Sequence, residues 1–441
     1  MGFAATLLYL ATLLLRPQEL YPVFAQYRIM DVLGAIAAAS TLLSLLIERR
    51  PRPVWQQLAT AALFLIWSAL SVAIAVRWLG GAAERLFDLL VQIYVLFILA
   101  LNVSSRRRLA ACVALICICL LVLLGQSASA YYSDVEQSPF FLKVIARSGV
   151  ADDLDAQEAP ELKAGDAEAG NVVYVRRARA LGFLHDPNDF AQAMVAIIPL
   201  LFLAWRPYAR TRNLLLVLVP AGLFVWGILL TRSRGGLLAL VLLLPLARLL
   251  RMRPRTRHVA TIALAVAAVP GFIVLFRYAL SDESAMGRIE AWSAGLQMLK
   301  ASPVWGVGSG FFMDHHVRVA HSSLVQCFAE TGLVGYFLWL AFVVLSLDLM
   351  SRLAETSTDE GWIHWARCVQ LSLLGFLVGA LFLSRTTSPL LFLITGISAA
   401  VASAARLDGQ TADLGRAWPV RVLGIEFASV LAVWLIAIAA W

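Results

Sequence analysis

Charged residues are scarce in this chain of 441 residues: they make up 15% of it, against 61% hydrophobic residues. Mean hydropathy is accordingly high, at +0.79. Soluble domains carry about 25% charged residues, so this composition excludes an ordinary soluble globular protein. Cysteine is also scarce, and all five cysteines lie within or beside apolar runs. We therefore expect no disulfide framework.

Several catalytic motifs are absent as well. No G-x-S-x-G sequence occurs, which argues against a Ser-His-Asp hydrolase. The glycine-rich sequence GVGSG at 306–310 is not followed by Lys-Ser or Lys-Thr, so it is not a P-loop. Three histidines beside an aspartate leave a metal site open: His315, His316, His321 and Asp314. Adjacent histidines rarely bind one ion together, so we expect neither a metal nor a cofactor.

Long apolar runs are what the chain has in abundance. A run of roughly 17–25 residues crosses the roughly 30 Å hydrocarbon core of a bilayer. We mark about thirteen runs, of which the first is short: 3–15, 30–47, 54–76, 86–103, 109–127, 188–205, 214–230, 235–250, 259–277, 323–350, 366–383, 389–405 and 421–440. No small-residue cleavage site follows the first run, so we expect it to be retained. The pattern predicts an all-α polytopic membrane protein, a bundle of about 12–13 transmembrane helices.

Arginine is concentrated in alternate connections between these runs: 48–53, 104–108, 206–213, 248–258, 351–367 and 406–421. The positive-inside rule places this set in the cytoplasm. Four of the other connections then face the opposite side: 128–187, 231–234, 278–322 and 384–388. The net charge of +8 comes mostly from the inner arginines. It therefore indicates orientation and contact with membrane lipids, and no nucleic-acid partner is expected.

This map divides the chain into five parts: N-terminal membrane helices (1–127), a first outer loop (128–187), central membrane helices with an Arg-Ser-Arg-Gly-Gly turn (188–277), a second outer loop (278–322) and C-terminal membrane helices (323–441). We expect the two long outer loops to form one cap on the membrane. Because almost all of the remaining chain is expected to lie within the membrane, this cap is where chemistry in water would take place.

The first outer loop ends in a cluster of polar residues. Asp186, Asn188 or Asp189 can cap the following helix, and Pro187 suits its first turn. A second interpretation is that these side chains form the polar wall of a site at the membrane surface. The sequence leaves both open.

Three arginines precede this cluster on the outer side, against the charge bias of the chain: Arg176, Arg177 and Arg179. They either pair with the acidic segment 151–170, or one of them holds an anionic substrate. For the second role we favour Arg179.

Two more arginines, Arg232 and Arg234, lie in the short outer turn TRSRGG. A helix begins there, and both helix N-termini and guanidinium groups bind phosphate. Gly235 and Gly236 allow a ligand or a neighbouring helix to approach the backbone closely. The alternative is that the arginines only anchor the turn to lipid headgroups.

In the second outer loop, Arg288 begins a segment whose apolar residues have helical spacing. This spacing predicts a short amphipathic helix on the membrane, which ends before Pro303. His321 comes directly before Ser322, at the start of the tenth apolar run. It is either a structural histidine or an imidazole that faces the outer cavity near the candidate anion-binding groups.

Three motifs in combination carry a resemblance: RARALGFLHDPNDFA, TRSRGGLLAL and RIEAW…SPVWGVGSGFF…HSSLVQCFAETGLVG. Over residues 170–345 the chain resembles the O-antigen ligase and polymerase superfamily of bacterial membrane glycosyltransferases. The resemblance implies transfer of a glycan from undecaprenyl pyrophosphate to an acceptor hydroxyl on the periplasmic side of the inner membrane. The implied acceptors are a lipid A core, another glycan or a protein, and neither nucleotide sugar nor metal is needed.

By its motifs, the resemblance implies catalytic roles for His321, Arg234 and Arg288. Ser322 stands where the family usually has asparagine, and Arg179 is a looser match. We assign substrate binding to five residues: Arg176, Arg179, Arg232, Asn188 and Ser322.

The expected chemistry is displacement of a pyrophosphate. Hydrogen bonds to a charged group contribute roughly 1.5–3 kcal/mol each, so two or three arginines could stabilise the leaving group. The histidine would accept the proton of the acceptor hydroxyl. No carboxylate is clearly placed for a covalent intermediate, and Glu330 is expected to be structural, so we predict inversion.

Two alternative functions remain open from the sequence. A polymerase would use a second carrier-linked repeat as its acceptor. A multi-span transporter would also need many helices and a basic vestibule. Transporters usually show paired repeats or charges near mid-membrane, and neither is visible in this chain.

Overall fold

The structure is a computed structural model that describes residues 2–47, 54–133, 138–147, 172–252, 256, 283–410 and 418–439. The predicted run 259–277 and the acidic segment 151–170 lie outside the described residues.

Helices dominate the described chain. Those before the first outer loop are α1 (Gly2–Leu15), α2 (Pro17–Leu20), α3 (Pro22–Ala25), α4 (Ile29–Ile47), α5 (Trp55–Ser71), α6 (Leu79–Asn102) and α7 (Arg106–Tyr132). Those after it are α8 (Pro187–Leu201), α9 (Arg210–Asn213), α10 (Val219–Thr231), α11 (Arg234–Arg251), α13 (Glu283–Ala301), α14 (Ser323–Thr356), α15 (Glu360–Ala380), α16 (Pro389–Leu407) and α17 (Trp418–Ala439). The strands β1 (Phe141–Arg147) and β2 (Val172–Ala178) form one antiparallel pair.

Within the described residues, nine helical segments are long and apolar enough to cross a membrane. They correspond to nine of the predicted runs and confirm an all-α polytopic membrane protein. Three further predicted runs, 3–15, 86–103 and 235–250, form α1, α6 and α11. Of these, α1 has only 14 residues, which at about 1.5 Å per residue is shorter than a bilayer core.

Small and polar residues allow the helices to pack closely, as is usual in a bilayer. Gly396 of α16 lies against α6, where an added Cβ would be 2.9 Å from Leu99 Cδ1. The Gln57 amide of α5 donates to Ser346 Oγ of α14 at 2.7 Å and to the Thr395 carbonyl of α16 at 3.1 Å. These contacts join the helices in the interior, where lipid offers no hydrogen bonds.

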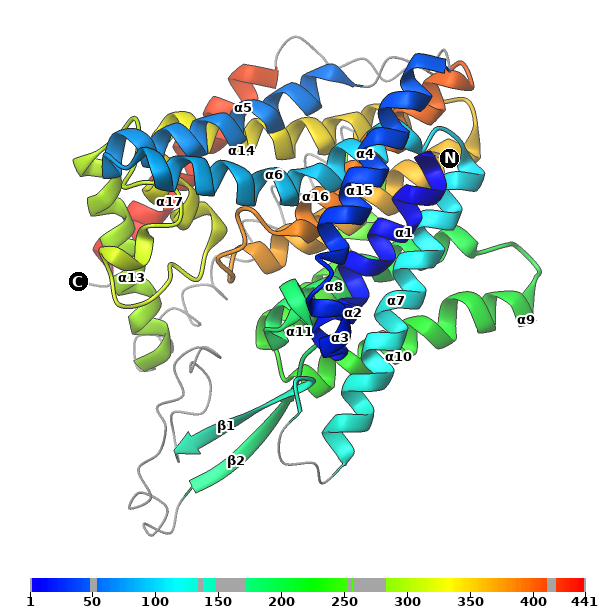
Figure 1. The fold of residues 1–441 in the computed structure, drawn as a ribbon, viewed down its shortest axis with the longest axis horizontal. Coiled ribbons are helices and arrows are strands. Elements are labelled where there is room, and N and C mark those ends of the chain that lie inside the picture. Colours follow the sequence, from blue (N-terminus) through cyan, green and yellow to red (C-terminus); the bar gives the residue numbers. More distant parts are fainter. Residues whose placement is uncertain are drawn as a thin grey trace.

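Figure 1 shows how the elements are arranged. Helices α5, α6 and α14 run side by side, and α13 and α17 lie at one end of the bundle. Helix α9 lies at the opposite end, and the β1–β2 hairpin projects from the body. The connections predicted to be outer and those predicted to be inner are thus separated along the bundle.

Contacts at the end opposite α13 join three of the predicted cytoplasmic connections. Arg106 of α7 pairs with Asp359, at 2.5 Å, and with Asp408, at 3.9 Å. The Trp362 indole also donates to Asp408 at 3.0 Å. The hydrogen bond from Arg106 holds the pKa of the Asp359 carboxyl below its usual range. These contacts agree with the predicted alternation of loops.

The hairpin extends the first outer loop. Phe141 lies opposite Ala178 in its register, and the Ser127 hydroxyl of α7 donates to the Phe140 carbonyl at 3.1 Å. The Arg179 N–H donates to the same carbonyl at 2.9 Å. The hairpin is therefore rooted on the end of α7.

The orientation can be tested by cysteine labelling in intact cells. Tyr208 is 100% exposed on the predicted inner side, and Val317 is 78% exposed on the predicted outer side. We expect a membrane-impermeant maleimide to label Val317→Cys but not Tyr208→Cys until the cells are opened. The five native cysteines are buried, so the wild-type protein is the low-background control. If only Tyr208→Cys were labelled in intact cells, the orientation would be the reverse of the predicted one.

Candidate active site

Four of the described helices, α8, α11, α14 and α16, begin at the same end of the bundle. Three begin with a side-chain cap: Asp186 accepts from Asn188 N at 2.7 Å, Ser233 from Gly236 N at 3.1 Å, and Ser388 from Leu390 N at 3.3 Å. Helix N-termini carry partial positive charge. This end of the protein is therefore favourable for an anion.

The first turn of α11 fits closely between α8 and the connection from α15 to α16. A Cβ added to Gly236 would lie 2.7 Å from Ala191 Cβ, and one added to Gly235 would lie 3.7 Å from Phe382 Cβ. Of the two partners predicted for this glycine pair, a ligand or a neighbouring helix, the structure shows protein: α8 and the connection from α15 to α16. Arg234 is the first residue of α11 and is exposed.

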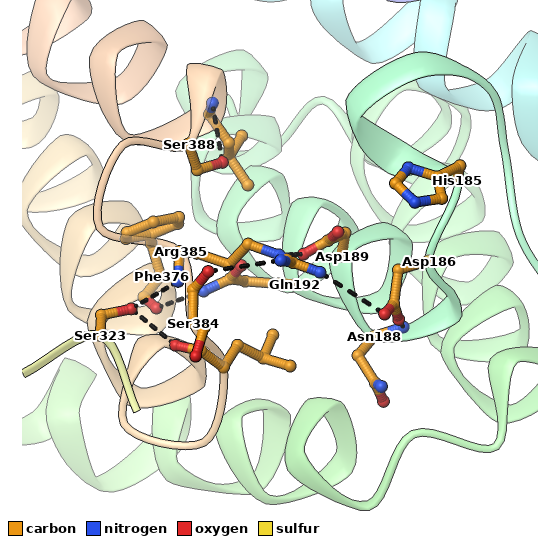
Figure 2. A network of polar contacts seen from close by, with 12 residues as sticks. His185, Asp186, Asn188, Asp189, Gln192, Ser323, Phe376, Ser384, Arg385 and Ser388 are labelled. Atoms are coloured by element: carbon orange, nitrogen blue, oxygen red, sulfur yellow. Dashed lines mark hydrogen bonds and ion pairs between the residues drawn. The ribbon is translucent and has the colours of Figure 1, made fainter. Parts of the chain in front are cut away.

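Arg385 joins α8 to the connection between α15 and α16 (Figure 2). Its guanidinium donates to Asp189 through Nε, and its Nη2 lies 3.5 Å from Asp186 Oδ2. Asp189 and Asp186 are 5% and 8% exposed, so a cation close by offsets the cost of burying them. The sequence analysis missed Arg385, although an arginine in an outer loop opposes the charge bias.

The connection that carries Arg385 also holds the start of α14. The Arg385 backbone N–H donates to Ser323 Oγ at 2.9 Å, and Ser323 Oγ donates to the Leu383 carbonyl at 2.6 Å. The Thr386 hydroxyl donates to the Ser323 carbonyl at 3.1 Å. His321 lies two residues before Ser323, so these bonds fix the segment that carries it.

His321 has a left-handed backbone, with φ of 48°. Its neighbour Ala320 accepts a hydrogen bond from the Trp292 indole of α13 at 2.9 Å. Arg288 lies one turn before Trp292 on the same helix. The structure thus brings the segments carrying Arg288 and His321 together, and α13 is the predicted helix that contains Arg288.

The other end of the second outer loop is fixed at a break in α14. Gly332 has φ of 67° inside this helix, and the freed Leu333 N–H donates to the Pro303 carbonyl at 2.8 Å. The Glu330 carbonyl accepts from Gly308 N at 2.9 Å, and its carboxylate accepts from Gly310 N at 2.8 Å. Glu330 therefore holds the loop in place.

Arg177, which was not among the predicted substrate-binding residues, links the start of α8 to the end of α10. Its Nη2 donates to Asn188 Oδ1 and its Nε to the Thr231 carbonyl, both at 3.0 Å. The predicted binding residue Asn188 is thus positioned beside the turn between α10 and α11. That turn contains Arg232, which is exposed and has φ of 51°.

Arg176 and Arg179 are bonded to backbone around the hairpin. Arg176 donates to the carbonyls of Tyr131, at 2.9 Å, and Ser133, at 3.1 Å. Arg179 Nε donates to the Pro139 carbonyl at 3.0 Å. Burial lowers the pKa of the Arg179 guanidinium, and the nearby Asp186 carboxylate offsets part of this effect.

Two further features complete the site. Ser322 is buried at the N-cap position of α14, but its hydroxyl does not accept a bond from the first turn.

Among the described residues, no group of three or more His, Cys, Asp or Glu side chains is arranged to hold a metal. This holds also for His315, His316 and His321, which the sequence had left open as ligands.

Part of the chain matches a known protein family. Residues 219–340 match the family described as O-antigen ligase. The resemblance seen in the sequence is confirmed, and the family's members are membrane glycosyltransferases of the ligase or polymerase type. No curated protein matches the chain.

The O-antigen ligase segment contains five of the eight predicted site residues: Arg232, Arg234, Arg288, His321 and Ser322. The other three precede it: Arg176 on β2, Arg179 directly after β2, and Asn188 at the start of α8. Contacts of Arg177 and Gly236 connect these two parts of the chain. The candidate site therefore combines the O-antigen ligase segment with the end of the first outer loop.

The close packing of α11 on α8 can be tested with Gly236→Ala. Its Cβ would overlap the Cβ of Ala191, so we expect a loss of about 1–3 kcal/mol, as for other overpacked sites. The measurement is thermal unfolding in detergent. The matched control is Gly222→Ala in α10, where nothing lies within 4 Å. An equal effect of the two variants would contradict the close approach.

Proposed function

We propose that this protein transfers a glycan from undecaprenyl pyrophosphate to an acceptor hydroxyl on the periplasmic side of the bacterial inner membrane. The observation that carries the proposal is the meeting of several helix starts at one membrane end, within and beside an O-antigen ligase segment. The reaction is metal-independent and inverting, and the family favours a transferase over the transporter alternative.

The diphosphate of the donor binds at the start of α11. Arg232 and Arg234 are exposed there, next to the backbone N–H groups of the first turn. The role of Arg288, on α13, is to stabilise the charge that develops on the leaving diphosphate. A lipid carrier can reach this place from the bilayer, because helix starts lie at the membrane boundary.

His321 accepts the proton of the attacking hydroxyl. Its segment is fixed to α13 through Ala320 and to the connection between α15 and α16 through Ser323. Such double fixation supports a general base, which must lie within hydrogen-bond reach of the proton. Ser322 and Asn188 orient the acceptor or the glycan, and Arg176 and Arg179 line the rim near the hairpin.

Inversion is supported by the state of the nearby carboxylates. A retaining enzyme uses a second carboxylate as nucleophile, close to the general acid. Asp186 and Asp189 are bonded to Arg385, and Glu330 is bonded to Gly310 N. With these groups engaged, direct displacement by the acceptor is the simplest mechanism.

A polymerase is the alternative within the same family, since only the acceptor differs. Analysis of the surface glycan in a deletion strain separates the two. Loss of attachment with normal chain length supports a ligase, and loss of long chains supports a polymerase.

The catalytic histidine is tested with His321→Ala. General base catalysis contributes roughly 10²–10⁴-fold, so we expect kcat to fall by about that factor with a defined undecaprenyl-pyrophosphate glycan. His315→Ala, an exposed residue of the same loop, is the control and should retain activity. Addition of a chelator should leave the rate unchanged. Full activity of His321→Ala refutes the assigned base.

The diphosphate site is tested with Arg234→Gln. Loss of one charge-assisted hydrogen bond costs roughly 1.5–3 kcal/mol, so we expect kcat/KM for the donor to fall about 10- to 100-fold. Arg212→Gln is the control, because Arg212 is exposed on α9 at the opposite end of the bundle. Equal kinetics for the two variants would argue against donor binding at α11.

A further inference from the structure

Arg385 takes part in two sets of contacts, one at the start of α14 and one at the start of α8. Its backbone N–H bonds to Ser323, and its guanidinium bonds to Asp189 and Asp186 at the start of α8. Figure 2 shows the guanidinium directed at these carboxylates and the Arg385 backbone beside Ser323. One residue therefore connects the beginnings of two helices.

The guanidinium of Arg385 is engaged by carboxylates. Two buried carboxylates without a cation would repel any anion nearby, and burying them unpaired would be costly. This arrangement differs from that of Arg232 and Arg234, which are exposed. Arg385 is thus built into the protein framework.

The position of His321 needs such a framework. A residue other than glycine with positive φ carries strain on the order of 1–3 kcal/mol and persists only where its surroundings hold it. On one side the Trp292 indole holds Ala320, and on the other side the Arg385 connection holds Ser323. Release of either side allows the backbone at His321 to relax.

We infer that Arg385 is a positioning residue: by tying Ser323 to Asp189 and Asp186, it holds His321 in its working geometry and does not bind the donor. The inference rests on the proposed function, in which His321 is the base. A displacement of about 1 Å at a reacting group can lower a rate about 10²-fold. Loss of the Arg385 side chain should therefore lower kcat and leave the KM for the donor unchanged.

The test is a double-mutant cycle of Arg385→Gln and Asp189→Asn, assayed with a defined undecaprenyl-pyrophosphate glycan. We expect each single variant to lower kcat at least about tenfold with an unchanged donor KM. The double variant should lose less than the product of the two single losses, because it leaves no unpaired guanidinium or Asp189 carboxylate. A raised donor KM for Arg385→Gln, or strictly multiplicative losses, would overturn the inference.

A second measurement does not depend on activity. Hydrogen exchange of peptides covering residues 318–328 should be faster in Arg385→Gln than in the wild-type protein. The control is Arg421→Gln, because Arg421 pairs with Asp348 at 3.0 Å near the other end of α14. Unchanged exchange at 318–328 in Arg385→Gln would refute the positioning role. An inactive wild-type protein would instead reject the proposed function and leave the exchange result decisive.

Discussion

The structure depends on one constraint: lipid cannot hydrogen-bond to the backbone, so each segment in the bilayer must satisfy its own N–H and C=O groups. Helices meet this demand except at their ends, where the first N–H groups stay unpaired. In a chain that crosses repeatedly, every second helix begins on the same side. The starts of α8, α11, α14 and α16 gather in this way, and their shared partial charge follows from the alternation alone.

The arginines at this end differ in what they contact. Arg176, Arg177 and Arg179 bond to carbonyl groups or to Asn188, and Arg385 bonds to carboxylates. Apart from the bond between Arg177 and Asn188, these contacts join residues that are 40 or more positions apart in the sequence. The arginines on the predicted outer side therefore serve partly to assemble the site, and an arginine there is not by itself a ligand group.

Much of the fold could be predicted from the sequence because hydropathy depends on local residues. Runs of apolar residues predicted the helices, and the spacing after Arg288 predicted α13. The glycine pair at 235–236 also predicted a close approach, but its partners, Ala191 and Phe382, depend on tertiary packing. The role of Arg385 was missed for the same reason. The residues that it contacts are about 60 and 200 positions away in the sequence, and a local sequence pattern cannot predict such contacts.

The break at Gly332 gives the second outer loop two attachments to one helix. Residues 303–310 are bonded beside the break, and His321 lies just before the start of the same helix. The stretch from Met313 to Arg318 between them is mostly exposed. Insertions or deletions there would reshape the outer rim while both attachments stay in register, so substrate preference could diversify without disturbing the imidazole.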